Sequence, residues 1–457
     1  MAGGLMQLVA YGAQDVYLTG NPQITFFKVV YRRHTNFAIE SIELGFTGSP
    51  GFGKKTTCTI SRNGDLVSNM VLQIKLGALP TPSSSWAWSS FLGHRIINFM
   101  EIEIGGQRID KQYGEWLHLW NQLTLPEAKK AGYNKMIGHT LGVLGKRGAD
   151  RIASVVTTAA VNPDAFQIAT GGAGTIVPLE AADTKEIVLN IPLQFWFCRN
   201  PGLALPLIAL QYHDVKVAIN FATLNDCIKD YTGTTFVANT PSIASNNSAI
   251  SFDANLFVDY IHLDTDERRR FAQLTHEYLI EQVQHVTEEI SNSDVKISLP
   301  FNHPIKELVW TISDDATEDA GEHFTYVGTP TLNPLNPGAE SDVSLVTGRQ
   351  DGVNTCKEAV LKLNGQDRFS ERSGNYFNLV QPYQHHTGIP YNGINSYSFA
   401  LRPEEHQPSG TCNFSRLDNA TLHIKVDTAA ARTVRAYAVN YNVLRIMSGM
   451  GGLAYSN

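Results

Sequence analysis

The stretch Ile102-Glu103-Ile104-Gly105-Gly106-Gln107-Arg108-Ile109-Asp110 shows how this chain is built. Apolar and polar residues alternate before a glycine pair, and a polar strand-like run follows it. This is the pattern of two β-strands joined by a tight turn. The same arrangement returns at Leu361-Lys362-Leu363-Asn364-Gly365-Gln366-Asp367-Arg368-Phe369. A strand, a two-residue turn and a second strand therefore occur in each half of the chain.

Strand-like alternation extends well beyond these two hairpins. It appears in Ile39–Leu44, Val71–Leu76 and Leu422–Val426, where apolar and polar residues alternate. Short alternating strands separated by Gly and Asn turns, with few helices, indicate an antiparallel sandwich or a jelly roll. The stretches Asp65–Leu76 and His303–Ile312 also look like corresponding strands. Together with the paired hairpins, they predict one sandwich duplicated in tandem.

Helical patterns are confined to a few places. Tyr113–Tyr133 carries Trp116, Leu119, Trp120 and Leu123 at helical spacing, which predicts a loop insertion containing a helix. Asp264–Leu274 opens with Asp and Thr capping residues, which predicts a short helical connector between the two sandwiches.

Three long regions interrupt the strands, at 77–95, 113–185 and 313–357. Loops of this length in a compact domain are usually functional, so we expect recognition or intersubunit surfaces there. Trp86 and Trp88 are candidate interface anchors in the first of these regions, although ordinary packing within the loop explains them equally well.

The composition limits the classes of function. A chain of 457 residues exceeds what one hydrophobic core usually organises, so two domains are expected. Charged residues make up 17%, below the usual quarter, which suggests that partners cover part of the surface. The net charge of −7 argues against wrapping nucleic acid through the overall field. The basic clusters Arg32–Arg33 and Arg268–Arg270 are interpreted as solvated charges.

Cysteine spacing and the N-terminus give no sign of secretion. The chain has five widely separated cysteines and no CxxC pair, which supports neither a disulfide framework nor a zinc site. Met1–Asp15 lacks the basic and apolar regions of a signal peptide. The most apolar stretch, Gly202–Leu210, is too short to span a bilayer.

No motif for catalysis stands out. Gly142–Arg147 lacks the first glycine and the Ser/Thr of a phosphate-binding loop. His276-Glu277 is not followed by a second histidine at the spacing of a zinc protease. His385 and His386 would face opposite ways in a strand and could not share a metal. The acidic pairs are interpreted as solvated loop faces: Asp314-Asp315, Glu318-Asp319 and Glu288-Glu289. We therefore expect no catalytic, cofactor-binding or metal-binding residues, no cofactor and no enzymatic activity.

Blocks of sequence along the whole chain resemble one known family. They include Gly3–Asp15, Leu18–Phe27, Tyr31–Phe37, Ile60–Leu66, Glu103–Asp110, Pro201–His213, His276–Gln282, Phe301–Pro304, Leu363–Phe369, Gln407–Ser415 and Tyr441–Tyr455. In this order they closely resemble the major capsid protein of nucleocytoplasmic large double-stranded DNA viruses, particularly those that infect algae. The loops between the blocks look individual to this chain.

The resemblance implies an all-β fold, a tandem double jelly roll of two eight-stranded antiparallel sandwiches. It places an N-terminal arm at 1–25 on the inner side of the shell, the first jelly roll at 26–264, a helical connector at 265–276 and the second jelly roll at 277–457. It further implies homotrimers with a pseudo-hexagonal outline that tile an icosahedral capsid.

The implied partners are other copies of the chain, minor capsid proteins and, through the N-terminal arm, the internal viral membrane. No sequence-specific binding to nucleic acid is expected. The implied location is the virion, with assembly in the host cytoplasm. Two alternatives are a jelly-roll carbohydrate-binding protein and a minor capsid protein at the vertices, for which a single jelly roll would be expected.

Overall fold

The computed structural model describes residues 3–10, 12–77, 86–139, 186–232, 235–237, 250–315, 318, 323–327, 354–426 and 430–455. The chain divides into two units, Met1–Phe37 and Ala38–Asn457. The stretch 142–147, compared above with a phosphate-binding loop, lies outside the described residues, as do part of the first long loop region and most of the other two.

The first unit, called here the N-terminal segment, has no core of its own. It contains two short helices, α1 (Gly3–Val9) and α2 (Val16–Thr19), followed by a stretch without helix or strand up to Asn36. Its apolar side chains are exposed, and Phe26 and Phe27 are 86% and 97% accessible. No helix in the described part of the chain is long and apolar enough to cross a membrane.

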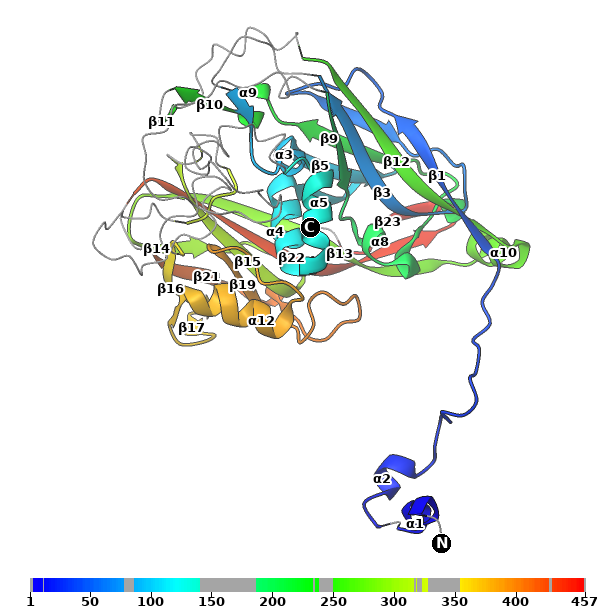
Figure 1. Ribbon diagram of the computed structural model, residues 1–457. Helices are drawn as coiled ribbons and strands as arrows, with labels where there is room; N and C mark the ends of the chain where they lie inside the picture. The colour runs from blue at the N-terminus through cyan, green and yellow to red at the C-terminus, as the bar shows by residue number, and fades with distance from the viewer. Residues whose placement is uncertain are drawn as a thin grey trace, which may run out of the picture. The chain divides into compact units, whose positions relative to one another are not determined.

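The second unit contains two β-sandwiches, and Figure 1 shows their strands in separate groups. The first sandwich has two main sheets with the strand orders β1-β12-β3-β7 and β2-β9-β5-β6, and a short strand, β8, also pairs with β3. Its strands are β1 (Phe37–Gly45), β2 (Lys55–Thr59), β3 (Leu66–Leu76), β5 (Ile97–Ile104), β6 (Gln107–Tyr113), β7 (Ile187–Pro192), β8 (Leu205–Pro206), β9 (Val215–Phe221) and β12 (Phe252–Leu263). A small separate sheet joins β4 (Trp86–Trp88), β10 (Ile228–Thr232) and β11 (Thr235–Val237).

The second sandwich repeats this plan with the orders β13-β22-β15-β19 and β14-β21-β16-β17. Three short strands, β18, β20 and β23, pair at its margins. Its strands are β13 (His276–Ile290), β14 (Asp294–Ser298), β15 (Pro304–Asp314), β16 (Cys356–Leu363), β17 (Gln366–Asp367), β18 (Arg372–Ser373), β19 (Ile394–Ser398), β20 (Cys412–Asn413), β21 (Ala420–Val426), β22 (Arg432–Met447) and β23 (Met450–Leu453).

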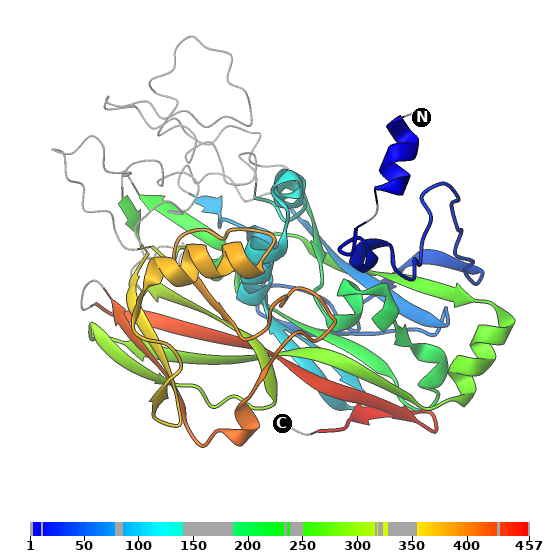
Figure 2. The same ribbon diagram turned by 90° about the horizontal axis from the view of Figure 1, so that it is seen from below.

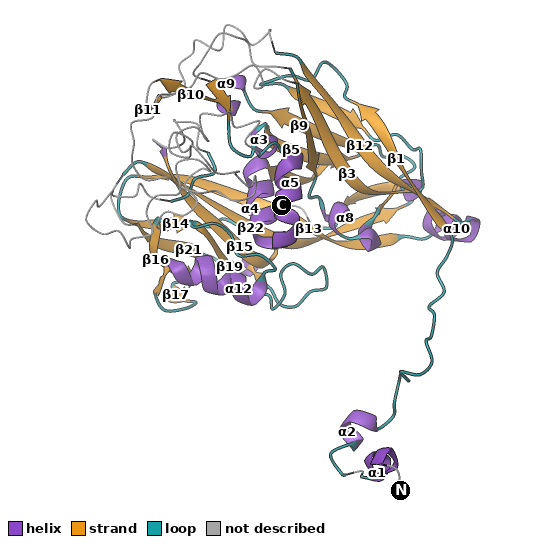
Figure 3. Ribbon diagram, viewed as in Figure 1, coloured by secondary structure: helices purple, strands orange, loops and turns teal. Residues whose placement is uncertain are grey.

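The two sandwiches have the same topology. In each, the first strand lies beside a late strand of that sandwich, which in turn pairs with the third strand: β1-β12-β3 in one and β13-β22-β15 in the other. Four strands in each of two facing sheets, connected in this way, form a jelly roll. Strands dominate the second unit (Figure 3), and the predicted tandem double jelly roll is confirmed.

The two hairpins noticed in the sequence occupy equivalent places. The turn between β5 and β6 has positive φ at Gly105 and Gly106, and the turn between β16 and β17 has positive φ at Asn364 and Gly365. Two consecutive residues with positive φ are what a type I′ turn requires, and Asn and Gly adopt that conformation most readily. The registers also agree, because Ile104 faces Gln107 and Leu363 faces Gln366.

Each jelly roll has its own hydrophobic core, formed by the alternating apolar residues of its sheets. In β21, Leu422, Ile424 and Val426 are buried while the intervening residues are partly exposed. Burying a side chain of this size contributes about 1.5–3 kcal/mol. The apolar residues of the alternating pattern are therefore those that point into the core.

The helix predicted within 113–133 is in fact two helices, α4 (Gly114–Thr124) and α5 (Glu127–Met136). Leu125 between them is extended, with ψ near 122°, and Pro126 follows it. A proline disfavours helical geometry in the residue before it and has no N–H to donate. The break therefore follows from Pro126.

The predicted helical connector is present as α10 (Thr265–Gln273), between β12 and β13. The limits predicted for the arm, the connector and the two jelly rolls stay predictions. Three more helical elements bear on the site below: α3 (Leu92–Arg95), α8 (Trp196–Arg199) and the continuous pair η5 (Tyr376–Val380) and α12 (Gln381–His385). Figure 2 shows this pair, in yellow and orange, along one side of the second sandwich.

Candidate functional site

The feature that sets this chain apart from a single sandwich is the contact between its two jelly rolls, called here the seam. Helix α4 lies in it, between the two groups of strands (Figure 1). The helical stripe recognised in the sequence packs there against β15 and β22, and the Trp116 ring lies 5.5 Å from the Tyr437 ring. The apolar part of the seam comprises Trp116, Leu119, Trp120, Leu123, Val283, Val309, Tyr326, Tyr437 and Val439.

Glu115, one residue before that stripe, ties α4 to the second jelly roll. Its carboxylate accepts hydrogen bonds from the hydroxyls of Thr311 at 3.1 Å, Tyr326 at 3.0 Å and Tyr437 at 2.9 Å. The Arg435 Nε lies 3.4 Å from the same carboxylate. Charge-assisted bonds of this kind are among the stronger hydrogen bonds in proteins, and four donors converge on one group here.

Arg435 extends this cluster to a second carboxylate. Its guanidinium binds both oxygens of Glu318, one of them at 2.9 Å, and donates to the Ser313 hydroxyl at 2.8 Å. Burial acts to raise the pKa of Glu318, but the hydrogen bond from Arg435 and its positive charge lower it overall. The interpretation of Glu318 as part of a solvated acidic run was therefore wrong, since its side chain is only 19% exposed.

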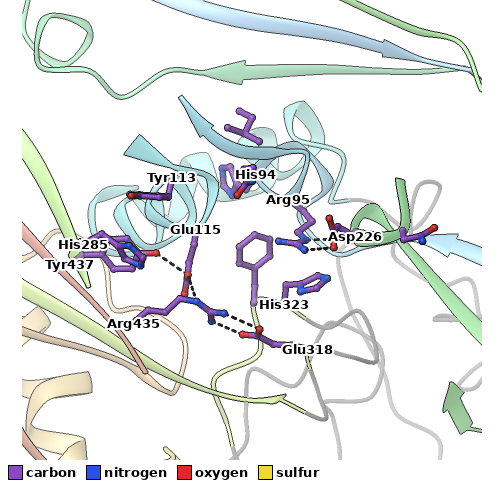
Figure 4. Close-up of a pocket in the computed structure, with 14 residues that line it drawn as sticks. His94, Arg95, Tyr113, Glu115, Asp226, His285, Glu318, His323, Arg435 and Tyr437 are labelled. Atoms are coloured by element: carbon purple, nitrogen blue, oxygen red, sulfur yellow. Dashed lines mark hydrogen bonds and ion pairs between the residues drawn. The ribbon is translucent and has the colours of Figure 1, made fainter. Parts of the chain in front are cut away.

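A cavity of about 660 Å³ opens beside this cluster (Figure 4). Its charged walls are paired with each other: Arg95 lies 3.2 Å from Asp226, and Arg435 lies between Glu115 and Glu318. Burial, together with the charges of Arg435 and Lys111, lowers the pKa of His285 to about 4, so this wall is uncharged at neutral pH. These charged groups of the cavity wall are thus paired with one another.

A second polar contact joins β6 to β13. Asp110 accepts hydrogen bonds from the Val283 backbone N–H at 3.1 Å and from Gln112 at 2.9 Å. Gln282 donates in the opposite direction, to the carbonyl of Ile109. Burial raises the pKa of Asp110 to about 6, although these hydrogen bonds act to lower it. The edge of one jelly roll is therefore hydrogen-bonded to the edge of the next.

A third polar cluster centres on Glu281 of β13. Its carboxylate lies 2.8 Å from the Lys306 ammonium and 2.9 Å from the guanidinium of Arg199, which comes from α8 of the first jelly roll. Burial alone would raise the pKa of Glu281, but the Lys306 charge and its neighbours lower it to about 2. Arg199 also stacks over the Trp120 ring at 4.0 Å. This ion cluster joins the two jelly rolls.

His386 supports the same region from within the second jelly roll. Its side chain is 1% exposed and lies 3.1 Å from Glu307 and 3.2 Å from Glu404. Burial acts to lower the pKa of His386, but the Glu307 carboxylate and then Glu404 raise it to about 9. The imidazolium thus neutralises Glu307, a carboxylate that is fully buried in β15.

The other residues singled out in the sequence lie apart from one another. Arg268 pairs with Asp65 at 3.0 Å on the exposed helix α10. The His276 ring makes a 2.8 Å contact with the carbonyl of Phe271. His385 and His386 lie at the end of α12 and not in a strand as assumed, because the helix begins at Gln381 with Pro382 in its first turn.

The cysteines and the tryptophan of the first loop belong to the packing. All five cysteines are free, and burial raises the pKa of Cys227 to about 12. Trp88 is 2% exposed and stacks on Phe52, so it is a core residue and not an interface anchor. The described residues contain no cluster of three or more His, Cys, Asp or Glu side chains that could hold a metal ion.

The sequence did not reveal the residues that matter most here. Glu115, Glu281, Lys306, Arg435 and His386 find their partners across long distances in the chain. One local pattern could have drawn attention to the site: Lys306-Glu307 interrupts the apolar run of β15, whose nine central residues are all buried. Charges in such a strand need internal partners.

The fold and the seam define a class of proteins in which two jelly rolls act as one body. A family model described as "Major capsid protein N-terminus" matches residues 25–264. A second family model, described as "Large eukaryotic DNA virus major capsid protein", matches residues 267–452. This chain belongs to the family of major capsid proteins of large eukaryotic DNA viruses.

Individual relatives agree over the full length. The chain is 48% identical to the major capsid protein of Phaeocystis pouchetii virus and 41% identical to that of Paramecium bursaria Chlorella virus 1, with complete coverage of both chains in each case. Among solved structures, the quasi-atomic PBCV-1 virus capsid superimposes with a TM-score of 0.71 at 36% identity, over 95% of this chain and all of the other. The Faustovirus major capsid protein has a TM-score of 0.69 at 15% identity, over 97% and 96%, and shares the fold.

Replacing Glu115 with glutamine keeps the size of the side chain but leaves Arg435 and three hydroxyls without the carboxylate. We expect the free energy of unfolding to fall by about 2–3 kcal/mol. Urea unfolding followed by tryptophan fluorescence measures this change. Glu127→Gln is the matched control, since that side chain is 85% exposed on α5. Equal midpoints for the two variants would contradict the role of Glu115 in the seam.

Replacing His386 with glutamine should change how stability depends on pH. The raised pKa of His386 means that its contribution is fully present below the unfolded value of about 6.5 and is lost as pH rises through about 9. The wild-type protein should therefore exceed His386→Gln in melting temperature by a gap that is largest near pH 6 and narrows towards pH 9.5. A gap that stays constant over this range would show that His386 is not charged in the folded protein.

Proposed function

We propose that this chain is the main structural subunit of an icosahedral shell that encloses a large double-stranded DNA genome. Three copies form a homotrimer, whose six jelly rolls give it a pseudo-hexagonal outline, and these trimers tile the shell. The role is structural and not enzymatic. The shared family and the full-length likeness to viral capsid proteins support this function.

The observation that carries the proposal is the repetition of one topology within a single body. Two jelly rolls with the same strand order are joined by three polar clusters and one apolar cluster. A threefold ring of such bodies presents six similar units, because heterologous contacts close when the rotation completes a circle. A single-jelly-roll vertex protein would lack this repetition.

A lattice also fits the weak and numerous contacts that assembly requires. Single contacts of a few kcal/mol let misplaced subunits leave, while a subunit with many neighbours is held firmly. We propose that minor capsid proteins cover part of the inner side, that assembly takes place in the host cytoplasm and that the product is the virion shell.

The N-terminal arm, residues 1–25, is proposed to bind on the inner side of the shell. The segment that contains it exposes Leu8, Tyr17 and Leu18 by 78%, 93% and 84%, and these side chains favour an apolar partner. A neighbouring trimer, a minor capsid protein and the internal membrane are the candidate partners.

The trimer can be tested by size-exclusion chromatography with light scattering. We expect three times the 50.3 kDa subunit mass, about 151 kDa, and hexagonal outlines in negative-stain images. A monomeric or dimeric mass over the micromolar range would reject the proposed capsomer and favour the carbohydrate-binding alternative.

Deleting residues 1–25 tests the arm separately. The truncated chain should still give the trimer mass, because the jelly rolls keep their own cores. It should assemble into sheets or shells less readily than the full chain, which electron microscopy under assembly conditions measures. Loss of the trimer itself would show that the arm acts within the capsomer and not between capsomers.

A further inference from the structure

Within the described part of the chain, strand β1 is an uncovered sheet edge. It stands at the end of its sheet, next to β12, and none of its nine residues is buried. The other edge strands of this sheet and of its counterpart, β13-β22-β15-β19, are covered. β7 contacts α3 and α5, β19 contacts η5 and α12, and β13 contacts β6. An uncovered edge presents free N–H and C=O groups, which natural proteins usually cover or block.

The seam shows how the equivalent edge is covered inside the chain. β13 is the counterpart of β1, and β6 is the counterpart of β17. Within the chain, two hydrogen bonds join β6 to β13. The Val283 N–H donates to the Asp110 carboxylate, and Gln282 donates to the Ile109 carbonyl. Among the described residues, no hydrogen bond or ion pair joins the matching pair, β17 and β1, although both strands are exposed.

We propose that β17 and β18 of one copy cover the β1 edge of the next copy, so that the interface between subunits repeats the internal seam. This proposal rests on the trimer described above and names the surfaces that form it. Internal seams and subunit interfaces then alternate around the ring, and three of each close it. The partner that β1 needs is a second copy of this chain.

The charges of the two edges are complementary. β1 carries Glu40 and Glu43, both exposed. Glu40 lies 3.6 Å from His262, and Glu43 accepts a hydrogen bond from the neutral Asn255 at 2.6 Å. Neither carboxylate is therefore paired with a lysine or arginine in the described part of the chain.

The opposite edge carries two arginines, Arg368 just after β17 and Arg372 in β18. It also carries Asp367 and Glu371, but these carboxylates are paired with Lys362 at 3.2 Å and with Lys425 at 2.6 Å. Both arginines are exposed, and neither has an ion pair with a carboxylate among the described residues. Arg372 stacks on the Tyr376 ring at 4.3 Å, which holds its guanidinium at the surface. Opposite charges facing each other across an interface set its register and exclude wrong partners.

Charge reversal tests this pairing. Glu40→Arg with Glu43→Arg, and separately Arg368→Glu with Arg372→Glu, should each raise the dissociation constant of the trimer at least about tenfold. The quadruple variant, with the charges exchanged, should bring it back towards the wild-type value. Sedimentation velocity over a dilution series measures all four proteins. Asp294→Arg is the control, because this exposed carboxylate lies in β14, at the other edge of the sheet that ends in β17.

A covalent trap gives a second measurement that does not depend on the reversed variants folding well. Ser41→Cys with Ser370→Cys should yield disulfide-linked dimers and trimers on non-reducing gels after mild oxidation, and neither single variant should. Suppose that the wild-type protein is a trimer, that no crosslink forms and that both charge reversals leave the dissociation constant unchanged. The assignment of the β1 and β17 edges to the interface is then wrong, while the proposed trimer remains supported. If the wild-type protein is a monomer, the proposed function itself fails.

Discussion

One carboxylate, that of Glu115, fixes how the two jelly rolls meet. It projects from the insertion of the first jelly roll and receives four donors from the second, on β15, on β22 and at Tyr326. Taking a carboxylate out of water is costly unless several donors replace the water, so other relative orientations of the jelly rolls would leave it unpaired. Apolar packing alone tolerates small rotations. The Glu115 cluster penalises them.

The ion cluster around Glu281 acts in the same direction from the other end of the seam. Arg199 reaches it from the first jelly roll, while Lys306 and Glu281 belong to the second. Buried ion pairs often add little net stability over apolar residues of the same size, but breaking one is expensive. Their arrangement here favours a single geometry, which a repeating tile needs more than it needs additional stability.

The strands and turns could be predicted because they are governed by local patterns. Alternation in β5, β16 and β21, and glycine or asparagine in the two type I′ turns, were enough to identify a duplicated sandwich. The break between α4 and α5 could also have been predicted, because Pro126 disfavours helical geometry in the residue before it. The partners of Glu115 were not, since Tyr437 lies 322 positions further along the chain and no local pattern connects them. His386 follows a helix and not a strand, because the chain is already helical from Gln381 to His385.

The two similar hairpins, Ile102–Asp110 and Leu361–Phe369, differ in the residue at their last position. Asp110 turns its carboxylate to β13, whereas Phe369, its counterpart, packs against the core of its own jelly roll. Six identical edges would let any jelly roll follow any other, and rings or ribbons of several sizes would compete. Divergence of the halves makes each edge accept one kind of neighbour. In the proposed trimer, the difference between the two halves would therefore favour a ring of three copies over rings of other sizes.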